Sequence, residues 1–103
     1  LSPEGVALYR LLISHPGHLA AALNMMANWD LGPLQRDLPR LRSELVLVSF
    51  ANDQTVPPAE AERVMPILPS AQRRRFPAFG HLAHEEAPHQ IYDLIRELAQ
   101  QAR

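Results

Sequence analysis

Several features that mark common classes of protein are missing from this chain of 103 residues. It has no cysteine, which excludes disulfides, thiolate metal sites and a cysteine nucleophile, and which permits a reducing compartment without requiring one. It has no apolar run near the roughly 20 residues of a membrane span, and no secretory signal is visible at its start. These absences predict a soluble, cytoplasmic protein without a membrane span.

A strong charge of either sign is missing as well. All ten basic residues are arginines, and eleven acidic residues leave a net charge of −1. A dedicated binder of nucleic acids or of acidic membranes would carry a clear positive excess. The sequence therefore predicts no nucleic-acid partner, and it predicts that partners are not chosen by bulk charge.

Apolar residues, in contrast, are plentiful. They make up 47% of the chain, which is enough for one small globular core but not for two. The chain begins with Leu1 rather than methionine, which predicts that further sequence lies upstream.

The first third of the chain is patterned for helices. Ser2 and Pro3 form a helix-start signal, and apolar residues follow at helical spacing as far as Ile13. After a break at Pro16, a second amphipathic helix is predicted over residues 18–29. Residues 34–42 predict a short turn of helix followed by a connector.

The remainder alternates strand and helix. Residues 45–50 form an apolar, β-favouring run of the kind found in parallel sheets covered on both faces. A helix is predicted from Pro57, a strand over residues 73–78 and a last helix from Pro88. The order predicts an α/β fold with a right-handed crossover. Two strands make an incomplete parallel sheet, so further strands are expected to pair with the apolar one.

Asp53 and His81 each follow one of the two predicted strands, and they are separated by 28 residues. Catalytic groups of open α/β sheets lie beyond the carboxyl ends of the strands. Adjacent parallel strands would bring both residues to one edge, where the carboxylate could accept a hydrogen bond from the imidazole and leave its other nitrogen to act as a base. The alternative is that Asp53 only caps the backbone of its own turn.

Two stretches resemble the acid and histidine blocks of the α/β-hydrolase family: residues 52–58, NDQTVPP, and residues 79–88, FGHLAHEEAP. The resemblance implies the C-terminal portion of an α/β-hydrolase fold, with Asp53 and His81 as two members of a catalytic triad. The nucleophile is expected upstream, because the glycines at 5, 17, 32 and 80 include no pair spaced for a Gly-x-Ser-x-Gly elbow. The remainder of the hydrolase core is thus an expected partner.

A narrower resemblance rests on residues 5–9, 18–23 and 25–31, which are similar to the magnesium-chelatase accessory proteins of bacteriochlorophyll biosynthesis (BchO type). This implies a link to magnesium insertion into protoporphyrin, with magnesium chelatase or a porphyrin as partner. Residues 1–31 would then be the end of a cap region and its return to the core, and residues 32–103 the C-terminal part of the core. Family members commonly have glycine where this chain has Phe50, so the ring is expected to affect how Asp53 points.

Other side chains admit two interpretations each. Met25, Met26, Trp29 and Leu82 could line a pocket, although methionine and tryptophan on an amphipathic helix also serve as core. Residues 73–75, all arginine, could contact a porphyrin propionate or a partner subunit, or could form a solvated strand edge. His81 and His84 lack the i, i+4 spacing of a helical zinc site, so no metal is expected, and no cofactor is expected either.

Three hypotheses for function follow. In the first, Asp53 orients His81, which acts as general base and then general acid in the hydrolysis of an ester-like small molecule. In the second, the hydrolase fold is a non-catalytic accessory protein that binds a porphyrin or the chelatase. In the third, the chain is a separate binding module, which would leave its apolar strand with an unsatisfied edge.

Overall fold

The computed structural model describes residues 2–102, which form two compact units divided between Arg40 and Leu41. The first unit consists of α1 (Pro3–Ile13), α2 (Pro16–Ala27), α3 (Gly32–Asp37) and the 3₁₀ turn η1 (Leu38–Arg40). The second consists of β1 (Val46–Phe50), α4 (Pro58–Val64), β2 (Gln72–Phe76), α5 (Ala83–Glu86) and α6 (Pro88–Gln101). The sequence predicted a different division, between a cap region that ends at residue 31 and a core that begins at residue 32. That assignment stays a prediction.

Local signals explain where the first helices begin. The Ser2 side chain accepts a hydrogen bond from the Gly5 N–H at 3.0 Å, which caps α1 as predicted. The second helix starts at Pro16 instead of His18, because proline fits the first helical turn, where its missing N–H has no partner to lose. None of the described residues of these helices is buried, and their apolar side chains are largely exposed.

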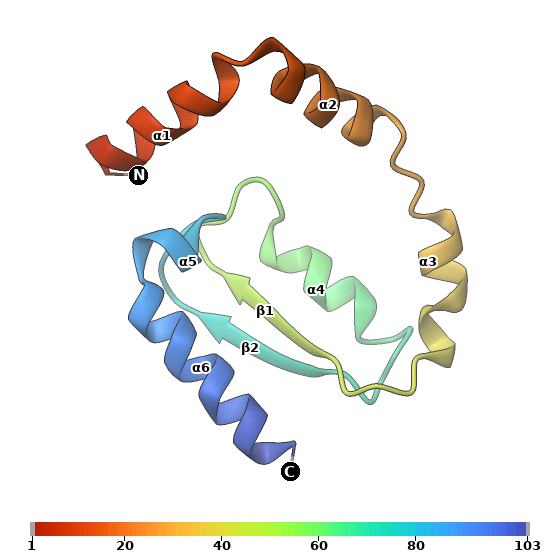
Figure 1. The fold of residues 1–103 in the computed structure, drawn as a ribbon. Coiled ribbons are helices and arrows are strands. Elements are labelled where there is room, and N and C mark those ends of the chain that lie inside the picture. The colour runs from red at the N-terminus through yellow and green to blue at the C-terminus, as the bar shows by residue number, and fades with distance from the viewer. Residues whose placement is uncertain (1, 103) are drawn as a thin grey trace. The chain divides into compact units, whose positions relative to one another are not determined.

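The second unit has the predicted order of strand, helix, strand and helix (Figure 1). β1 and β2 pair in parallel, with Val46 opposite Gln72 and Phe50 opposite Phe76. The mixed α/β class and the parallel pairing are therefore confirmed. The short helix α5 was not predicted.

Helices α4 and α6 cover opposite faces of this strand pair (Figure 1). Arg73 forms an ion pair with Glu62 of α4, whereas the next residue, Arg74, pairs with Glu97 of α6 at 2.9 Å. Successive side chains of a strand point to opposite faces, so neighbouring arginines reach different helices. Both pairs are partly exposed and contribute about 0.2–1 kcal/mol each.

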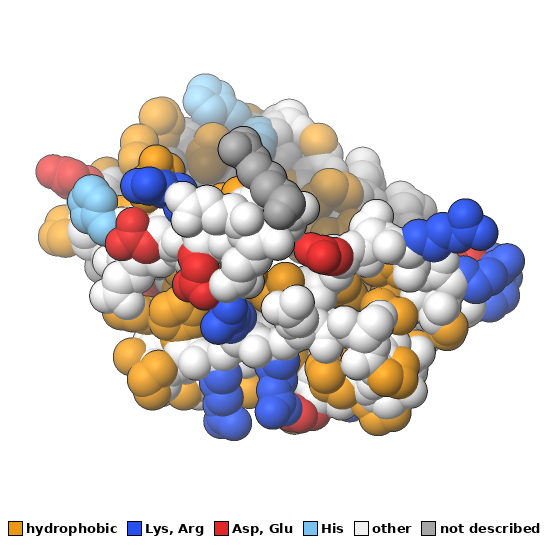
Figure 2. Space-filling model, turned by 90° about the horizontal axis from the view of Figure 1, so that it is seen from below, with side chains coloured by type: hydrophobic (Ala, Val, Ile, Leu, Met, Phe, Trp, Pro, Cys, Tyr) orange, Lys and Arg blue, Asp and Glu red, His pale blue; other side chains and the backbone are white. Residues whose placement is uncertain are grey.

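Few apolar side chains are fully covered by the described part of the chain. The buried apolar residues are Leu68, Ala71, Ala83 and Leu94. The helical spacing of apolar residues in the last helix predicts that Ile95 faces inward with Leu94, but Ile95 is 60% exposed, so that prediction is wrong. A sheet of two strands is too narrow to cover the whole apolar face of α6. Figure 2 shows apolar side chains spread among charged ones over the visible face.

Candidate functional site

Asp53 lies in the turn that follows β1, and the backbone of that turn fixes its carboxylate. Its Oδ1 accepts hydrogen bonds from the N–H groups of Thr55 at 2.9 Å and Val56 at 2.8 Å. This is the local capping expected of an aspartate in a turn. Only 8% of the side chain is exposed, so the carboxylate has little freedom to rotate.

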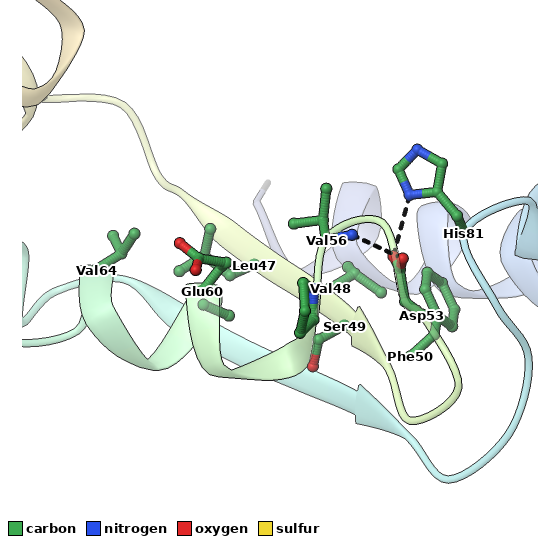
Figure 3. Close-up of a pocket in the computed structure, with 11 residues that line it drawn as sticks. Leu47, Val48, Ser49, Phe50, Asp53, Val56, Glu60, Val64 and His81 are labelled. Carbon is green, nitrogen blue, oxygen red and sulfur yellow. Dashed lines mark hydrogen bonds and ion pairs between the residues drawn. The ribbon is translucent and has the colours of Figure 1, made fainter. Parts of the chain in front are cut away.

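The second carboxylate oxygen is turned to His81. Asp53 Oδ2 lies 3.1 Å from His81 Nδ1, within hydrogen-bonding distance (Figure 3). The imidazole is 48% exposed, and Nε2 lies on the side of the ring away from Asp53. Asp53 therefore caps its own turn with one oxygen and contacts the histidine with the other, so the expected contact and the local capping are both present.

Backbone hydrogen bonds join the turn after β1, which carries Asp53, to the turn after β2, which leads to His81. The Ala51 N–H donates to the Phe76 carbonyl at 3.0 Å, and the Asn52 N–H donates to the Phe79 carbonyl at 3.1 Å. Phe79 has a φ of 71°, the left-handed conformation that is unfavourable for a side chain of this size. Strained backbone of this kind persists where its surroundings impose it. Here it directs a carbonyl to the turn that carries Asp53.

Phe50 does not displace Asp53 from His81, although a bulky ring at this position was expected to affect the acid. Its ring stacks on Phe76, its partner in the strand register, with centroids 5.3 Å apart and an angle of 28° between the planes. Aromatic pairs at this separation are attractive. The ring is thus accommodated by its neighbour on β2, and the hydrogen bond between Asp53 and His81 is retained.

The pKa of the Asp53 carboxyl is lowered from its usual value of 3.8. The hydrogen bond from the Val56 N–H is the largest cause, and the contacts with His81 and the Thr55 N–H add to it, while burial acts in the opposite direction. Hydrogen bonds to a carboxylate favour its charged form. Asp53 is therefore ionised at neutral pH and can stabilise a positive charge on His81.

This lowered pKa predicts a specific dependence of stability on pH. A carboxyl group whose pKa is lower in the folded state stabilises that state above the unfolded pKa, and the effect is lost as pH falls through the folded pKa. We expect the difference in unfolding free energy between the protein and its Asp53→Asn variant to narrow below pH 3.8. Urea titrations from neutral to strongly acid pH measure it, and a difference independent of pH would contradict this account.

A pocket of about 420 Å³ lies beside the two residues (Figure 3). Its walls are mostly apolar and come from β1 and α4, with Asp53 and His81 at one end and the carboxylate of Glu60 as a further polar group. Glu60 is 51% exposed and pairs with Arg63 at 3.3 Å. The lining residues are Leu47, Val48, Ser49, Phe50, Asp53, Val56, Pro57, Glu60, Ala61, Val64 and His81.

The residues predicted to line a pocket are not among these. Met25, Met26 and Trp29 belong to the first unit, where they are 54%, 54% and 63% exposed and are not covered by the other described residues. Leu82 is half-buried next to His81. Their participation in a binding pocket stays a prediction.

Two of the three consecutive arginines at positions 73–75 form ion pairs with helices. Arg73 and Arg74 form the ion pairs with α4 and α6, while Arg75 makes no ion pair with another described residue. Within residues 2–102, no group of three histidine, aspartate or glutamate side chains is placed to hold a metal ion. The described helices also include none long and apolar enough to cross a membrane.

Sequence reasoning offered backbone capping by Asp53 only as an alternative, and it did not name the N–H groups of Thr55 and Val56 that hold the carboxylate. The left-handed conformation of Phe79 had no signal in the sequence, because a phenylalanine rarely adopts it.

Comparison with known proteins identifies a relative of this chain. The chain is 38% identical over 95 residues to the magnesium-chelatase 30 kDa subunit of Rhodobacter capsulatus. The chain is homologous to this subunit. The match covers 92% of the chain but only 33% of the relative, so the chain spans about a third of the length of the protein that it matches. The narrower resemblance, to the magnesium-chelatase accessory proteins, is thereby confirmed, whereas no family model matches the chain.

Proposed function

We propose that this chain supplies the acid and the histidine of a hydrolase-type catalytic triad, Asp53 and His81, for the cleavage of an ester-like small molecule. The observation that carries the proposal is the 3.1 Å contact between Asp53 Oδ2 and His81 Nδ1 beyond the ends of adjacent parallel strands. The proposal rests also on the resemblance of residues 52–58 and 79–88 to the acid and histidine blocks of α/β hydrolases. The α/β-hydrolase fold of the intact protein is part of the same proposal.

The chemistry follows from the tautomer that Asp53 selects. An ionised carboxylate accepts the proton on Nδ1, so neutral His81 carries its lone pair on Nε2. Nε2 then takes a proton from a hydroxyl nucleophile and later returns it to the leaving group. The positive charge that forms on the ring in between is stabilised by the carboxylate.

The nucleophile and the oxyanion hole belong to the part of the protein outside this chain in this proposal. No serine of the chain stands in a Gly-x-Ser-x-Gly context, and the Nε2 atom of His81 makes no hydrogen bond with another described residue. Nε2 is thus available to a nucleophile delivered from elsewhere. The ester would be bound where that segment meets the edge carrying Asp53 and His81.

A second candidate is an accessory role without catalysis, favoured by the name of the relative, a subunit of magnesium chelatase. In that case the hydrolase fold binds the chelatase or a porphyrin during bacteriochlorophyll synthesis, and the pair is idle. Fold alone does not separate the candidates, because function belongs to the site.

The experiment that separates them is His81→Ala in the intact protein, with His84→Ala as the matched control. His84 is 62% exposed and lies three residues further along the chain. We measure hydrolysis of a chromogenic short-chain ester together with the formation of magnesium porphyrin in cells. If the site is catalytic, ester hydrolysis and magnesium porphyrin formation both fall in His81→Ala, and both are unchanged in His84→Ala.

If ester hydrolysis is absent in the unaltered protein, or if pigment formation is the same in both variants, the catalytic proposal is wrong. The accessory role then accounts for the relationship. Circular dichroism of each variant shows whether a loss comes from the site or from unfolding.

A further inference from the structure

The pocket beside Asp53 and His81 has acidic groups but no basic side chain other than the imidazole. Asp53 and Glu60 contribute carboxylates, and no arginine from residues 2–102 lines it. The other lining residues are apolar, apart from Ser49. When His81 acts as a base its ring is uncharged, and the pocket then has two carboxylates and no cation. A ligand in this pocket meets apolar walls and a negative potential.

Local hydrogen bonds fix the place of Glu60 relative to Asp53. The Val56 N–H donates to Asp53 Oδ1 at 2.8 Å, and the Glu60 N–H donates to the Pro57 carbonyl at 2.9 Å in the first turn of α4. Val56 and Pro57, which connect the two acids along the chain, also line the pocket. Both carboxylates therefore belong to one short stretch of chain that borders the pocket (Figure 3).

The ion pair with Arg63 leaves the negative charge of Glu60 available to the pocket. Arg63 Nη1 lies 3.3 Å from Glu60 Oε2, and the two side chains are 74% and 51% exposed. Ion pairs this exposed are weak and are screened by salt. Arg63 is also not one of the lining residues, so it does not offer a cation to a ligand inside the pocket.

We propose that Glu60 restricts the pocket to uncharged acyl groups, so that an ester with an apolar chain is accepted and one whose chain ends in a carboxylate is disfavoured. This rests on the proposed function, because it names the substrate class of that same site. A ligand carboxylate would lose water and lie near like charges on Asp53 and Glu60. An uncharged chain of the same length buries apolar surface instead. Such an unfavourable contact excludes the wrong ligand and so gives specificity.

A pair of matched esters tests this in the intact protein. Both have the same chromogenic leaving group and the same acyl chain length, but one is a hexanoate and the other is the mono-ester of adipic acid, which ends in a carboxylate. The quantity compared is the ratio of kcat/KM for the adipate to kcat/KM for the hexanoate. We expect this ratio to rise by about 3- to 10-fold in Glu60→Gln. A general disturbance of the site would lower both rates and leave the ratio unchanged.

Two control variants separate the charge of Glu60 from other effects. Glu62→Gln removes one negative charge from the same helix, but Glu62 pairs with Arg73 and does not line the pocket, so the ratio is expected to stay the same. Glu60→Asp keeps the charge and is expected to keep most of the discrimination. Added salt should reduce the discrimination in the unaltered protein more than in Glu60→Gln, because salt screens the charge.

The results separate this inference from the catalytic proposal. If the unaltered protein hydrolyses both esters and the ratio is the same in Glu60→Gln as in Glu62→Gln, the role of Glu60 is wrong and the catalytic proposal stands. If the unaltered protein hydrolyses neither ester, the catalytic proposal is wrong, and the role of Glu60 in selecting its substrate is wrong with it.

Discussion

Replacing Asp53 by Asn is expected to lower kcat for an ester substrate by about 10³- to 10⁴-fold in the intact protein, with the fold unchanged. The asparagine carbonyl can take the place of Oδ1 and accept the same bonds from Thr55 and Val56. Its NH₂ group then faces His81 where Oδ2 was, and it donates to Nδ1. The proton moves to Nε2, which can no longer act as a base.

Steady-state kinetics with a chromogenic ester measure this loss, and Asp93→Asn is the matched control. Asp93 is exposed on α6 and carries the same charge, so its removal changes net charge without touching the site. If kcat of Asp53→Asn lies within about threefold of kcat of the unaltered protein, the contact between Asp53 and His81 serves no catalytic step.

Leu68→Ala is expected to lower the free energy of unfolding by about 2–4 kcal/mol, the largest effect on stability among the changes considered. Leu68 is 6% exposed and lies between α4 and β2, where it is one of the few buried apolar side chains. Its N–H bonds to the Val64 carbonyl at 2.9 Å, and its own carbonyl accepts from Ala71 at 3.0 Å. A cavity at this position cannot be filled easily, because the backbone on both sides is held.

The neighbouring Ile67 provides the control. It has a side chain of similar size but is 42% exposed, so Ile67→Ala is expected to cost about 1 kcal/mol or less. Urea denaturation of the two variants compares them directly. If both changes lower the unfolding free energy equally, the burial of Leu68 does not contribute the stability assigned to it.

The order of elements in the second unit could be predicted from sequence because each has a strong local signal. β1 is a continuous β-favouring run, and prolines stand at the starts of α4 and α6. The contact between Asp53 and His81 was foreseeable because the carboxyl ends of parallel strands share one edge. Both predictions rested on periodicity or topology, which a single sequence contains.

Details that depend on packing could not be predicted in the same way. Ile95 continues the apolar stripe of α6, yet its exposure depends on the width of the sheet beneath it. The positive φ of Phe79 accompanies the hydrogen bond that its carbonyl accepts from Asn52, a contact between two turns that no local pattern encodes. Stacking of Phe50 on Phe76 likewise follows from the strand register, and no local pattern encodes it.

The unequal anchoring of the two site residues has a thermodynamic consequence. The Asp53 carboxylate is oriented by hydrogen bonds within its own turn, which do not involve the imidazole, whereas His81 is half exposed. The remaining entropy of assembling the pair therefore lies mostly in the rotation of one side chain, at χ1 and χ2 of His81. A surface or ligand that restrains only that ring would complete the arrangement, and the acid would need no adjustment.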